Sequence, residues 1–256
     1  MTKQKLHVII FANQMTQTKF PHVFFKIDGK YSITILLESL FFLEEKYELF
    51  IYILVPLSHM EMIQDCGKFW IRENITYHGT TRNDQDICIL SEFYNAHPHL
   101  FPSDDLWLMY PLSYPLLESI HISEIIDKYN NQALAFILKK RDFILRSSVP
   151  VLIQNGKCVF TDVAPHHFMQ ITLLDGNNFK ALFHFCYPWD VPYYKCVLWT
   201  PVEISLFCHE TELYSIDTPQ DVTIIETKIL QKQIKEMSVE IQKLKNDIEH
   251  IVKKKV

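Results

Sequence analysis

Apolar runs alternate with helix-like periodicities along the first 140 residues of the chain. The stretch LHVIIFA at residues 6–12 is continuously apolar, as is LFIYILV at residues 49–55, and such runs are typical of strands buried on both faces. Between them, residues 32–47 carry apolar side chains at helical spacing, with Ser32 as the expected N-cap. The same reasoning predicts strands at residues 75–77, 106–110 and 133–138, and helices at residues 85–94 and 123–129.

Strands that alternate with helices in units of about 30 residues predict a three-layer, Rossmann-like α/β sandwich around a doubly wound parallel sheet. We expect the strand at residues 6–12 inside this sheet, and a nucleotide-type crevice at the carboxyl ends of the strands. From residue 149 to residue 208 the pattern changes to short β-prone pieces and aromatic-rich loops. This part is predicted to be an excursion with one or two antiparallel β-hairpins. Its aromatic residues, among them Trp189, Tyr193 and Tyr194, would fill a core or an interface, or stack on a sugar.

The C-terminal tail follows a different pattern. Thr218, Pro219 and Asp221 form a helix start, with Thr as N-cap, Pro in the first turn and Asp at the capping-box position that Glu usually takes. Apolar residues then recur at alternating steps of four and three, with Ile at every a position and Leu, Met, Leu and Ile at the successive d positions. This choice favours a parallel two-stranded coiled coil. The seam residues are Leu230, Ile234, Met237, Ile241, Leu244, Ile248 and Ile251.

We therefore divide the chain into a body, residues 1–221, and a C-terminal coiled-coil helix, residues 222–256. The preferred interpretation is a homodimer, joined through the coiled coil and through the body. Glu240 at g and Lys245 at the following e would then pair between the two chains. The alternative is that the helix packs on its own body through the same stripe.

Composition and charge narrow the classes of function. The 256 residues include 25 Lys and Arg against 30 Asp and Glu, and this net charge of −5 argues against binding a nucleic-acid backbone, which needs clustered cations. Neither a signal peptide nor a membrane span is visible. Six cysteines without a C-x-x-C pair indicate reduced, mostly buried thiols. We expect a soluble, cytoplasmic protein.

Four segments, in chain order, share motifs with a known family. Residues 8–30, VIIFANQMTQTKFPHVFFKIDGK, contain a strand, a loop and a turn, and Ala12, Thr16, Pro21, Gly29 and Lys30 match the family pattern there. Residues 78–96 are similar to R-G-x-x-x-D-V-L-x-R-Y-x-x-A, and residues 106–126 to a strand followed by P-L-I. Residues 214–222, YSIDTPQDV, are close to I-D-T-P-E-D-L. Together these segments resemble the nucleotide-sugar cytidylyltransferases of the acylneuraminate, Kdo and spore-coat polysaccharide branch.

The resemblance implies the nucleotide-diphospho-sugar transferase fold and a reaction in which CTP and a sugar acid or sugar phosphate give a nucleotide-sugar and pyrophosphate. It also implies Mg²⁺ as the cofactor of an active enzyme, and a nucleotide or sugar as the ligand. The implied nucleotide-binding residues are Ala12, Asn13, Thr16, Gln17, Lys19, His22 and Arg82, and the implied metal ligand is Asp217.

The phosphate loop departs from the family pattern. Glycines in such a loop let backbone N–H groups approach a phosphate without a Cβ in the way, yet this chain has no glycine before Gly29. Asn13 and Met15 occupy the glycine positions, and Gln17 occupies that of the loop arginine. His22 replaces a lysine and is largely neutral at pH 7. The alternative to a phosphate contact is that His22 is an ordinary solvated loop residue.

The predicted metal site also departs from the family pattern. The family aspartate that precedes P-L-I aligns with Leu112 or Ser113, while Asp104 and Asp105 lie at the opposite end of the predicted strand. Asp217 is left as the candidate carboxylate, and its alternative role is that of a helix cap.

Two functions stay open at this point. The first is a divergent cytidylyltransferase. The second is a catalytically inactive pseudoenzyme that serves as an oligomeric ligand-binding or scaffold component of a glycan pathway. For Arg82, a structural ion pair with Asp86 is the alternative to a nucleotide contact. Because the changes fall on the loop and the metal site, we expect turnover to be absent or very slow.

Overall fold

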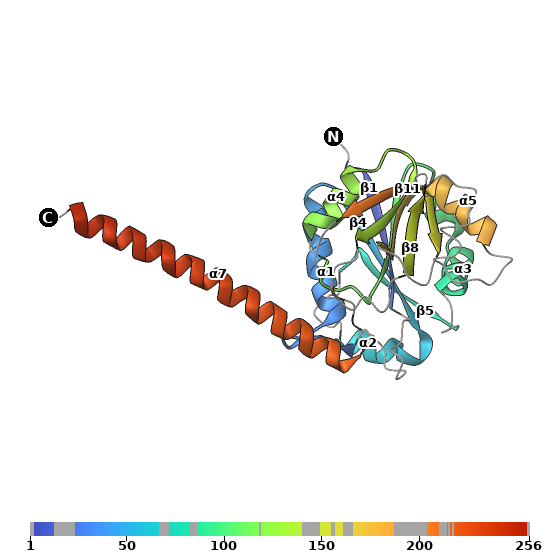
Figure 1. Ribbon diagram of the computed structural model, residues 1–256. Helices are drawn as coiled ribbons and strands as arrows, with labels where there is room; N and C mark the ends of the chain where they lie inside the picture. Colours follow the sequence, from blue (N-terminus) through green and yellow to red (C-terminus); the bar gives the residue numbers. More distant parts are fainter. Residues whose placement is uncertain are drawn as a thin grey trace.

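A central β-sheet with helices on both faces forms the body of the protein in the computed structural model (Figure 1). The structure describes residues 3–12, 24–66, 72–81, 86–117, 119–139, 149–154, 157–160, 166–186, 204–209, 214, 216 and 218–254. Within these residues nine strands make up the sheet. They are β1 (Lys5–Phe11), β4 (Glu48–Pro56), β5 (Ile75–Thr80), β6 (Leu106–Pro111), β7 (Ala133–Lys139), β8 (Val149–Gln154), β9 (Lys157–Phe160), β10 (His166–Asp175) and β11 (Ile204–His209).

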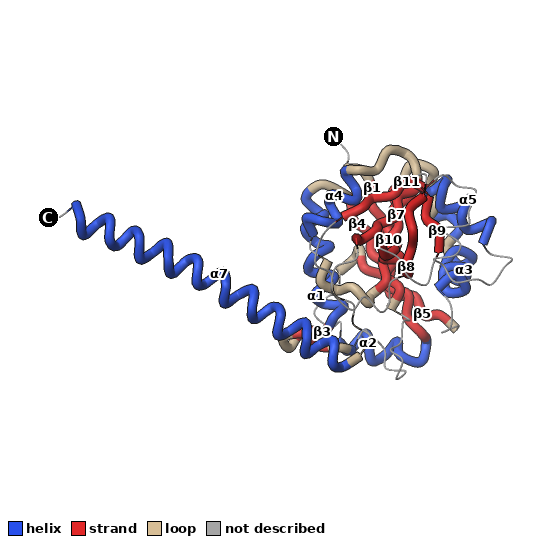
Figure 2. Tube along the Cα trace, in the orientation of Figure 1, coloured by secondary structure: helices blue, strands red, loops and turns tan. Residues whose placement is uncertain are grey.

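The helices form the two outer layers of the sandwich, and Figure 2 shows them on either side of the strands. α1 (Ser32–Phe41) and α4 (Ser119–Asp127) cover one face, while α3 (Asp86–Ala96) and α5 (Gly176–Cys186) cover the other. These layers confirm the predicted three-layer α/β class. The remaining elements are α2 (Met60–Cys66), the short 3-10 helices η2 (Phe42–Glu45), η3 (Leu57–His59) and η4 (Pro98–Leu100), a separate ribbon of β2 (Lys26–Ile27) and β3 (Lys30–Tyr31), and the long helix α7 (Pro219–Lys254).

The first strand lies inside the sheet, as its continuous apolar run predicts. The strand order is β11-β7-β10-β6-β1-β4-β5, and β1 is parallel to both of its neighbours. Leu6 lies opposite Leu49 on β4 and Leu106 on β6. Because side chains alternate along a strand, β1 buries Leu6, Val8 and Ile10 against one helical layer and Ile9 and Phe11 against the second.

Strand β10 corrects the prediction that residues 149–208 form only an excursion. It lies between β6 and β7 and runs antiparallel to both, so that Leu173 faces Leu108 on one side and Leu134 on the other. The register shifts between Phe168 and Thr172, where Gln170 has a φ of 58°. This bulge interrupts the regular alternation by which a strand is recognised in a sequence. The predicted hairpin is confirmed as β8 and β9, which join the sheet through β10.

Two further elements of this region, α5 and β11, were not expected from the sequence. Asp175 caps α5, since its carboxylate accepts a hydrogen bond of 2.7 Å from the backbone N–H of Asn178. β11 extends the sheet as a parallel neighbour of β7. Cys208 on β11 is an exposed free thiol, and the expectation that most of the cysteines are buried stays a prediction.

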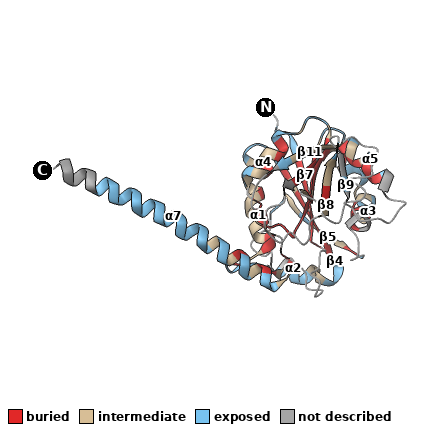
Figure 3. Cartoon of the chain, in the orientation of Figure 1, coloured by how far each residue is buried: buried red, intermediate tan, exposed pale blue. Residues whose placement is uncertain are grey.

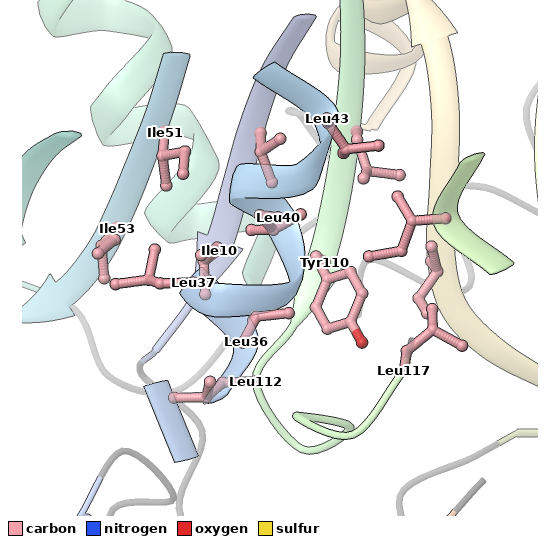
Figure 4. Close-up of a cluster of buried hydrophobic side chains, with 14 of the residues drawn as sticks. Ile10, Leu36, Leu37, Leu40, Leu43, Ile51, Ile53, Tyr110, Leu112 and Leu117 are labelled. Atoms are coloured by element: carbon pink, nitrogen blue, oxygen red, sulfur yellow. The ribbon is translucent and has the colours of Figure 1, made fainter. Parts of the chain in front are cut away.

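The core beneath α1 is aliphatic (Figure 4). Leu36, Leu37 and Leu40 of this helix pack on strands β1 and β4 and beside Tyr110 of β6, and all are fully buried. The predicted N-cap is wrong by one residue: Tyr31 is the N-cap, and Ser32 is the first residue of the helix. The N–H of Ser32 donates to the carbonyl oxygen of Phe25 at 2.8 Å, so the residue just before β2 supplies the acceptor that a capping side chain would otherwise provide.

Helix α7 begins with the predicted capping box. The backbone N–H and the hydroxyl of Thr218 donate to one carboxylate oxygen of Asp221, at 2.7 and 2.9 Å. The first turns then pack on the body, where Ile225 is buried with Phe25 and Ile27 of the ribbon segment. From residue 230 to residue 248 every residue is exposed and the helix projects away from the body (Figure 3). None of the described helices is both long and apolar enough to cross a membrane.

Replacing Asp221 with Ala is expected to lower the free energy of unfolding by about 1–2 kcal/mol, because the buried cap of a helix end that packs on the body is lost. Denaturant titration at neutral pH measures this change. Thr227→Ala is the control: its hydroxyl bonds only to the helix carbonyl of Thr223 on an exposed turn, and the expected change is within about 0.5 kcal/mol. Equal effects of the two variants would contradict a capping role.

Candidate functional site

The carboxyl ends of β1, β4, β5 and β6 lie side by side and form the candidate edge. Two backbone hydrogen bonds continue the ladder beyond β1: the N–H of Ala12 donates to Leu54 at 3.0 Å, and the N–H of Leu112 donates to Phe11 at 3.3 Å. Ala12 is 2% exposed. The chain therefore leaves β1 at a fixed point in the middle of a parallel sheet, where ligands of open α/β folds bind, just before the phosphate loop predicted from the sequence.

The end of β6 carries no acidic side chain. Leu112 is fully buried and Ser113 is 1% exposed. The hydroxyl oxygen of Ser113 has no hydrogen-bond partner among the described residues. The hydroxyl of Tyr110 donates to the carbonyl oxygen of Tyr114, which ties the turn back to the strand. This position thus offers one neutral hydroxyl where the family resemblance leads us to expect an aspartate.

The segment at residues 214–222 docks on this same strand end. The backbone N–H of Ile216 donates to the carbonyl oxygen of Ser113 at 2.9 Å, and Thr218 opens the capping box of α7. Ile216 is fully buried, with Tyr214 packed beside it. The fold therefore brings the described part of the segment at residues 214–222 to the candidate edge, where Ile216 makes a backbone hydrogen bond and Ile216 and Tyr214 make apolar contacts.

The described residues do not form a carboxylate site for Mg²⁺ at this edge. Among them no group of three or more His, Cys, Asp or Glu side chains could hold a metal ion. Mg²⁺ prefers carboxylate and phosphate oxygens in an octahedral arrangement, which Ser113 and Leu112 do not supply.

Only part of the site predicted from the sequence falls within the described residues. Ala12 lies at the candidate edge, as expected. The other predicted nucleotide-binding and metal-binding residues lie outside the described part of the chain, and their roles remain predictions. They are Asn13, Thr16, Gln17, Lys19, His22, Arg82 and Asp217.

Glu92 on α3 is a polar residue of this edge that the sequence reasoning missed. Its carboxylate accepts a hydrogen bond of 2.8 Å from the backbone N–H of Thr81, just beyond β5, and a second one from the Thr81 hydroxyl. One signal was present, because the family pattern R-Y-x-x-A has an arginine where this chain has Glu92. The carboxylate occupies a backbone donor at the end of β5 and adds a negative charge near the edge, and both effects disfavour a phosphate there.

The opposite, amino edge of the sheet holds a buried polar cluster. As expected, Asp105 lies at this end of β6. The His7 Nε2–H donates to the Asp105 carboxylate at 2.9 Å, and the Tyr52 hydroxyl donates to His7 Nδ1 at 3.2 Å. The imidazole stacks on Trp107, with ring centroids 4.2 Å apart.

Burial controls protonation in this cluster. It lowers the pKa of His7, an effect that the hydrogen bond from His7 to Asp105 opposes. Burial and the negative charge of Asp105 raise the pKa of Tyr52 to about 12. His7 is therefore a neutral core residue, and its carboxylate partner is too far along the strand to serve the carboxyl edge.

Comparison with known proteins identifies the fold. No family model and no curated protein sequence matches the chain. Among solved structures, 4-diphosphocytidyl-2C-methyl-D-erythritol synthase from Anaerococcus prevotii superimposes with a TM-score of 0.65 at 13% identity, over 89% of this chain and 96% of that one. The inositol-1-phosphate CTP transferase from T. maritima gives 0.65 at 13% identity, over 86% and 93%.

A third structure, CMP:2-keto-3-deoxy-manno-octonic acid synthetase complexed with CTP, gives a TM-score of 0.64 at 12% identity and covers 90% of this chain and all of that one. The structural neighbours are thus cytidylyltransferases, the family that the four sequence segments resemble. At this level of identity the likeness establishes the nucleotide-diphospho-sugar transferase fold.

Proposed function

We propose that the protein is a cytidylyltransferase-like component of nucleotide-sugar metabolism that binds a cytidine nucleotide but transfers its nucleotidyl group very slowly or not at all. In this proposal it acts as a homodimeric ligand-binding or scaffold protein. The observation that carries the proposal is the buried, uncharged end of β6, where Leu112 and Ser113 stand in place of a metal-binding carboxylate. The intact parallel edge supports a retained nucleotide site.

The physical argument concerns the charge of the triphosphate. Attack on its α-phosphate releases pyrophosphate, and the developing charge must be stabilised by N–H groups, cations or Mg²⁺. This chain has Asn13, Met15 and Gln17 at the loop positions concerned. Each lost contact is worth a few kcal/mol in the transition state, and about 1.4 kcal/mol is a factor of ten in rate. Three such losses together would reduce turnover by many orders of magnitude.

An active, divergent cytidylyltransferase is the second candidate, and a specific observation favours it. The segment that contains Asp217 is joined to the end of β6 by the hydrogen bond from Ile216 to Ser113. Mg²⁺ held by Asp217, by substrate phosphates and by water would then serve a reaction between CTP and a sugar acid or sugar phosphate.

Calorimetric titration of the full-length protein with CTP, CDP and UTP, with and without Mg²⁺, tests nucleotide binding. We expect saturable binding of the cytidine nucleotides that changes little on addition of Mg²⁺. A parallel assay of pyrophosphate release from CTP, with sialic acid, Kdo or a sugar phosphate as acceptor, should give a rate near that of the buffer. Failure of every nucleotide to bind would contradict the proposal, and rapid pyrophosphate release would favour the second candidate.

A pair of charge-removing variants locates the binding site. Lys19→Ala removes the candidate loop cation and is expected to weaken CTP binding about tenfold, as the loss of one charge-assisted contact would. Lys243→Ala removes an equal charge from the exposed distal part of α7 and should leave the affinity unchanged. If both variants bind CTP like the unmodified protein, the nucleotide does not contact Lys19.

A further inference from the structure

Helix α7 carries a long apolar stripe that its own body leaves uncovered. Six large side chains of the stripe are each between 52% and 60% exposed although they recur at heptad spacing, and the helix stands clear of the body in Figure 1. The alternative that the stripe packs on the body is therefore wrong for the described residues. These side chains are Leu230, Ile234, Met237, Ile241, Leu244 and Ile248.

We infer that this seam pairs, parallel and in register, with the same seam of a second copy of the chain. Contact with water along such an apolar stripe is unfavourable, and a matching seam removes it. A second copy offers the same heptad phase along the whole length. The β-branched residues Ile234, Ile241 and Ile248 at a, with Leu at two of the four d positions, favour two strands over three or four.

The flanking charges favour the parallel orientation. In a parallel pair, position g of one helix faces position e of the next heptad on the other, which brings Glu240 toward Lys245 of the second copy. Both side chains are exposed on α7, so they are available to each other. In an antiparallel pair of near-complete overlap, g faces g, and Glu240 would lie close to Glu240 of the second copy. The like charges disfavour that arrangement.

The seam is a direct continuation of the candidate edge. One uninterrupted helix of 36 residues runs from Pro219, beside the capping box, to the end of the seam. Its first turns are fixed to the body by Ile225 and by the Glu226 carboxylate, which accepts a hydrogen bond of 3.0 Å from the N–H of Asp28. Parallel pairing therefore places both bodies at the same end of a paired seam about 32 Å long, from Leu230 to Ile251, each with its candidate edge next to the start of that seam.

Substitutions within and outside the seam test the pairing. Light scattering and sedimentation of the full-length protein should give the mass of a dimer, and Ile241→Asp with Leu244→Asp should weaken the dimer, so that the mass falls toward that of a monomer on dilution. Val239→Asp is the matched control, since Val239 is 65% exposed on the same helix but lies off the seam, and this variant should remain a dimer. Thermal melting of each variant checks that the body is still folded.

A cysteine introduced into the seam tests whether the two helices are parallel. With Cys208 replaced by Ser, Ile248→Cys should form an intermolecular disulfide in mild oxidant, because equal a positions meet only in a parallel pair in register. Cross-linking that requires a mixture of Leu230→Cys and Ile248→Cys chains would instead establish an antiparallel pair. A monomeric unmodified protein, a trimer or tetramer, or a dimer that survives the double Asp substitution would each overturn the inference.

Discussion

Replacing Gly176 with Ala is expected to destabilise the body by about 3 kcal/mol. Gly176 is the first residue of α5, and its N–H donates to the carbonyl oxygen of Asp105 at 3.1 Å. A Cβ at this position would lie 1.8 Å from the carbonyl oxygen of Pro102 and 2.8 Å from the carbonyl carbon. Both are backbone atoms that cannot rotate away, so α5 would have to move off the sheet. Denaturant titration followed by circular dichroism measures the loss.

Gly29→Ala is the matched control for this prediction. Gly29 has a φ of 76° in the turn between β2 and β3, and an added Cβ would meet no atom within 4 Å. The cost there is conformational alone, about 1 kcal/mol for a left-handed residue. If Gly29→Ala proves as harmful as Gly176→Ala, the close approach of α5 to Pro102 is not what makes glycine necessary at position 176.

The same contact explains why the sequence did not reveal α5. The helix has a recognisable start, because the Asp175 carboxylate accepts a hydrogen bond from the N–H of Asn178. It also has apolar residues at helical spacing, namely Phe179, Leu182 and Phe183. Yet Gly176 and two asparagines in the first turn are typical of loops, and the requirement for glycine arises from Pro102, some 70 positions earlier in the chain. A constraint of this kind becomes visible only when the packing is known.

Strand prediction succeeded where burial on both faces makes the sequence uniform. β1 and β4 are parallel strands between two helical layers, so nearly every position requires an apolar side chain. β10 is just as central, but the bulge at Gln170 and the two histidines at its start break that uniformity. The sequence pattern therefore predicted the strands of the parallel half of the sheet. For residues 149–208 it predicted antiparallel hairpins, but not a strand in the middle of the sheet.

The candidate site was predictable to a smaller extent. Ala12 and the segment at residues 214–222 were located because each adjoins a strong local signal, an apolar strand and a capping box. Glu92 was not, since its role depends on Thr81 at the end of a different element. The uncharged end of β6 was located from the sequence, because Leu112 or Ser113 aligns with the family aspartate, whereas the burial of both residues became visible only with the fold.

Replacing His7 with Ala is expected to lower the free energy of unfolding by about 3 kcal/mol or more. The imidazole is 5% exposed and stacks on Trp107, so its removal leaves a cavity inside the sheet layer. It also leaves the Asp105 carboxylate without the N–H that it accepts from at 2.9 Å. His7→Phe retains a ring of similar shape and should lose less stability than His7→Ala, although it removes the same hydrogen bonds.

The pH dependence of stability separates the titration of His7 from its packing. Burial holds the pKa of folded His7 below the value of 6.5 that the unfolded chain has. As the pH falls through about 6.5, the unfolded state therefore takes up a proton that the folded state does not, and the unmodified protein loses stability.

The groups around the ring that act on its charge are Lys5, Glu48, Tyr52 and Asp105. Burial also lowers the pKa of His78, and its contribution is common to both proteins and cancels in their difference. Denaturant titrations from pH 8 to pH 5 should thus give a flatter profile for His7→Phe than for the unmodified protein, whereas parallel profiles would mean that His7 is protonated to the same extent in the folded and unfolded chains.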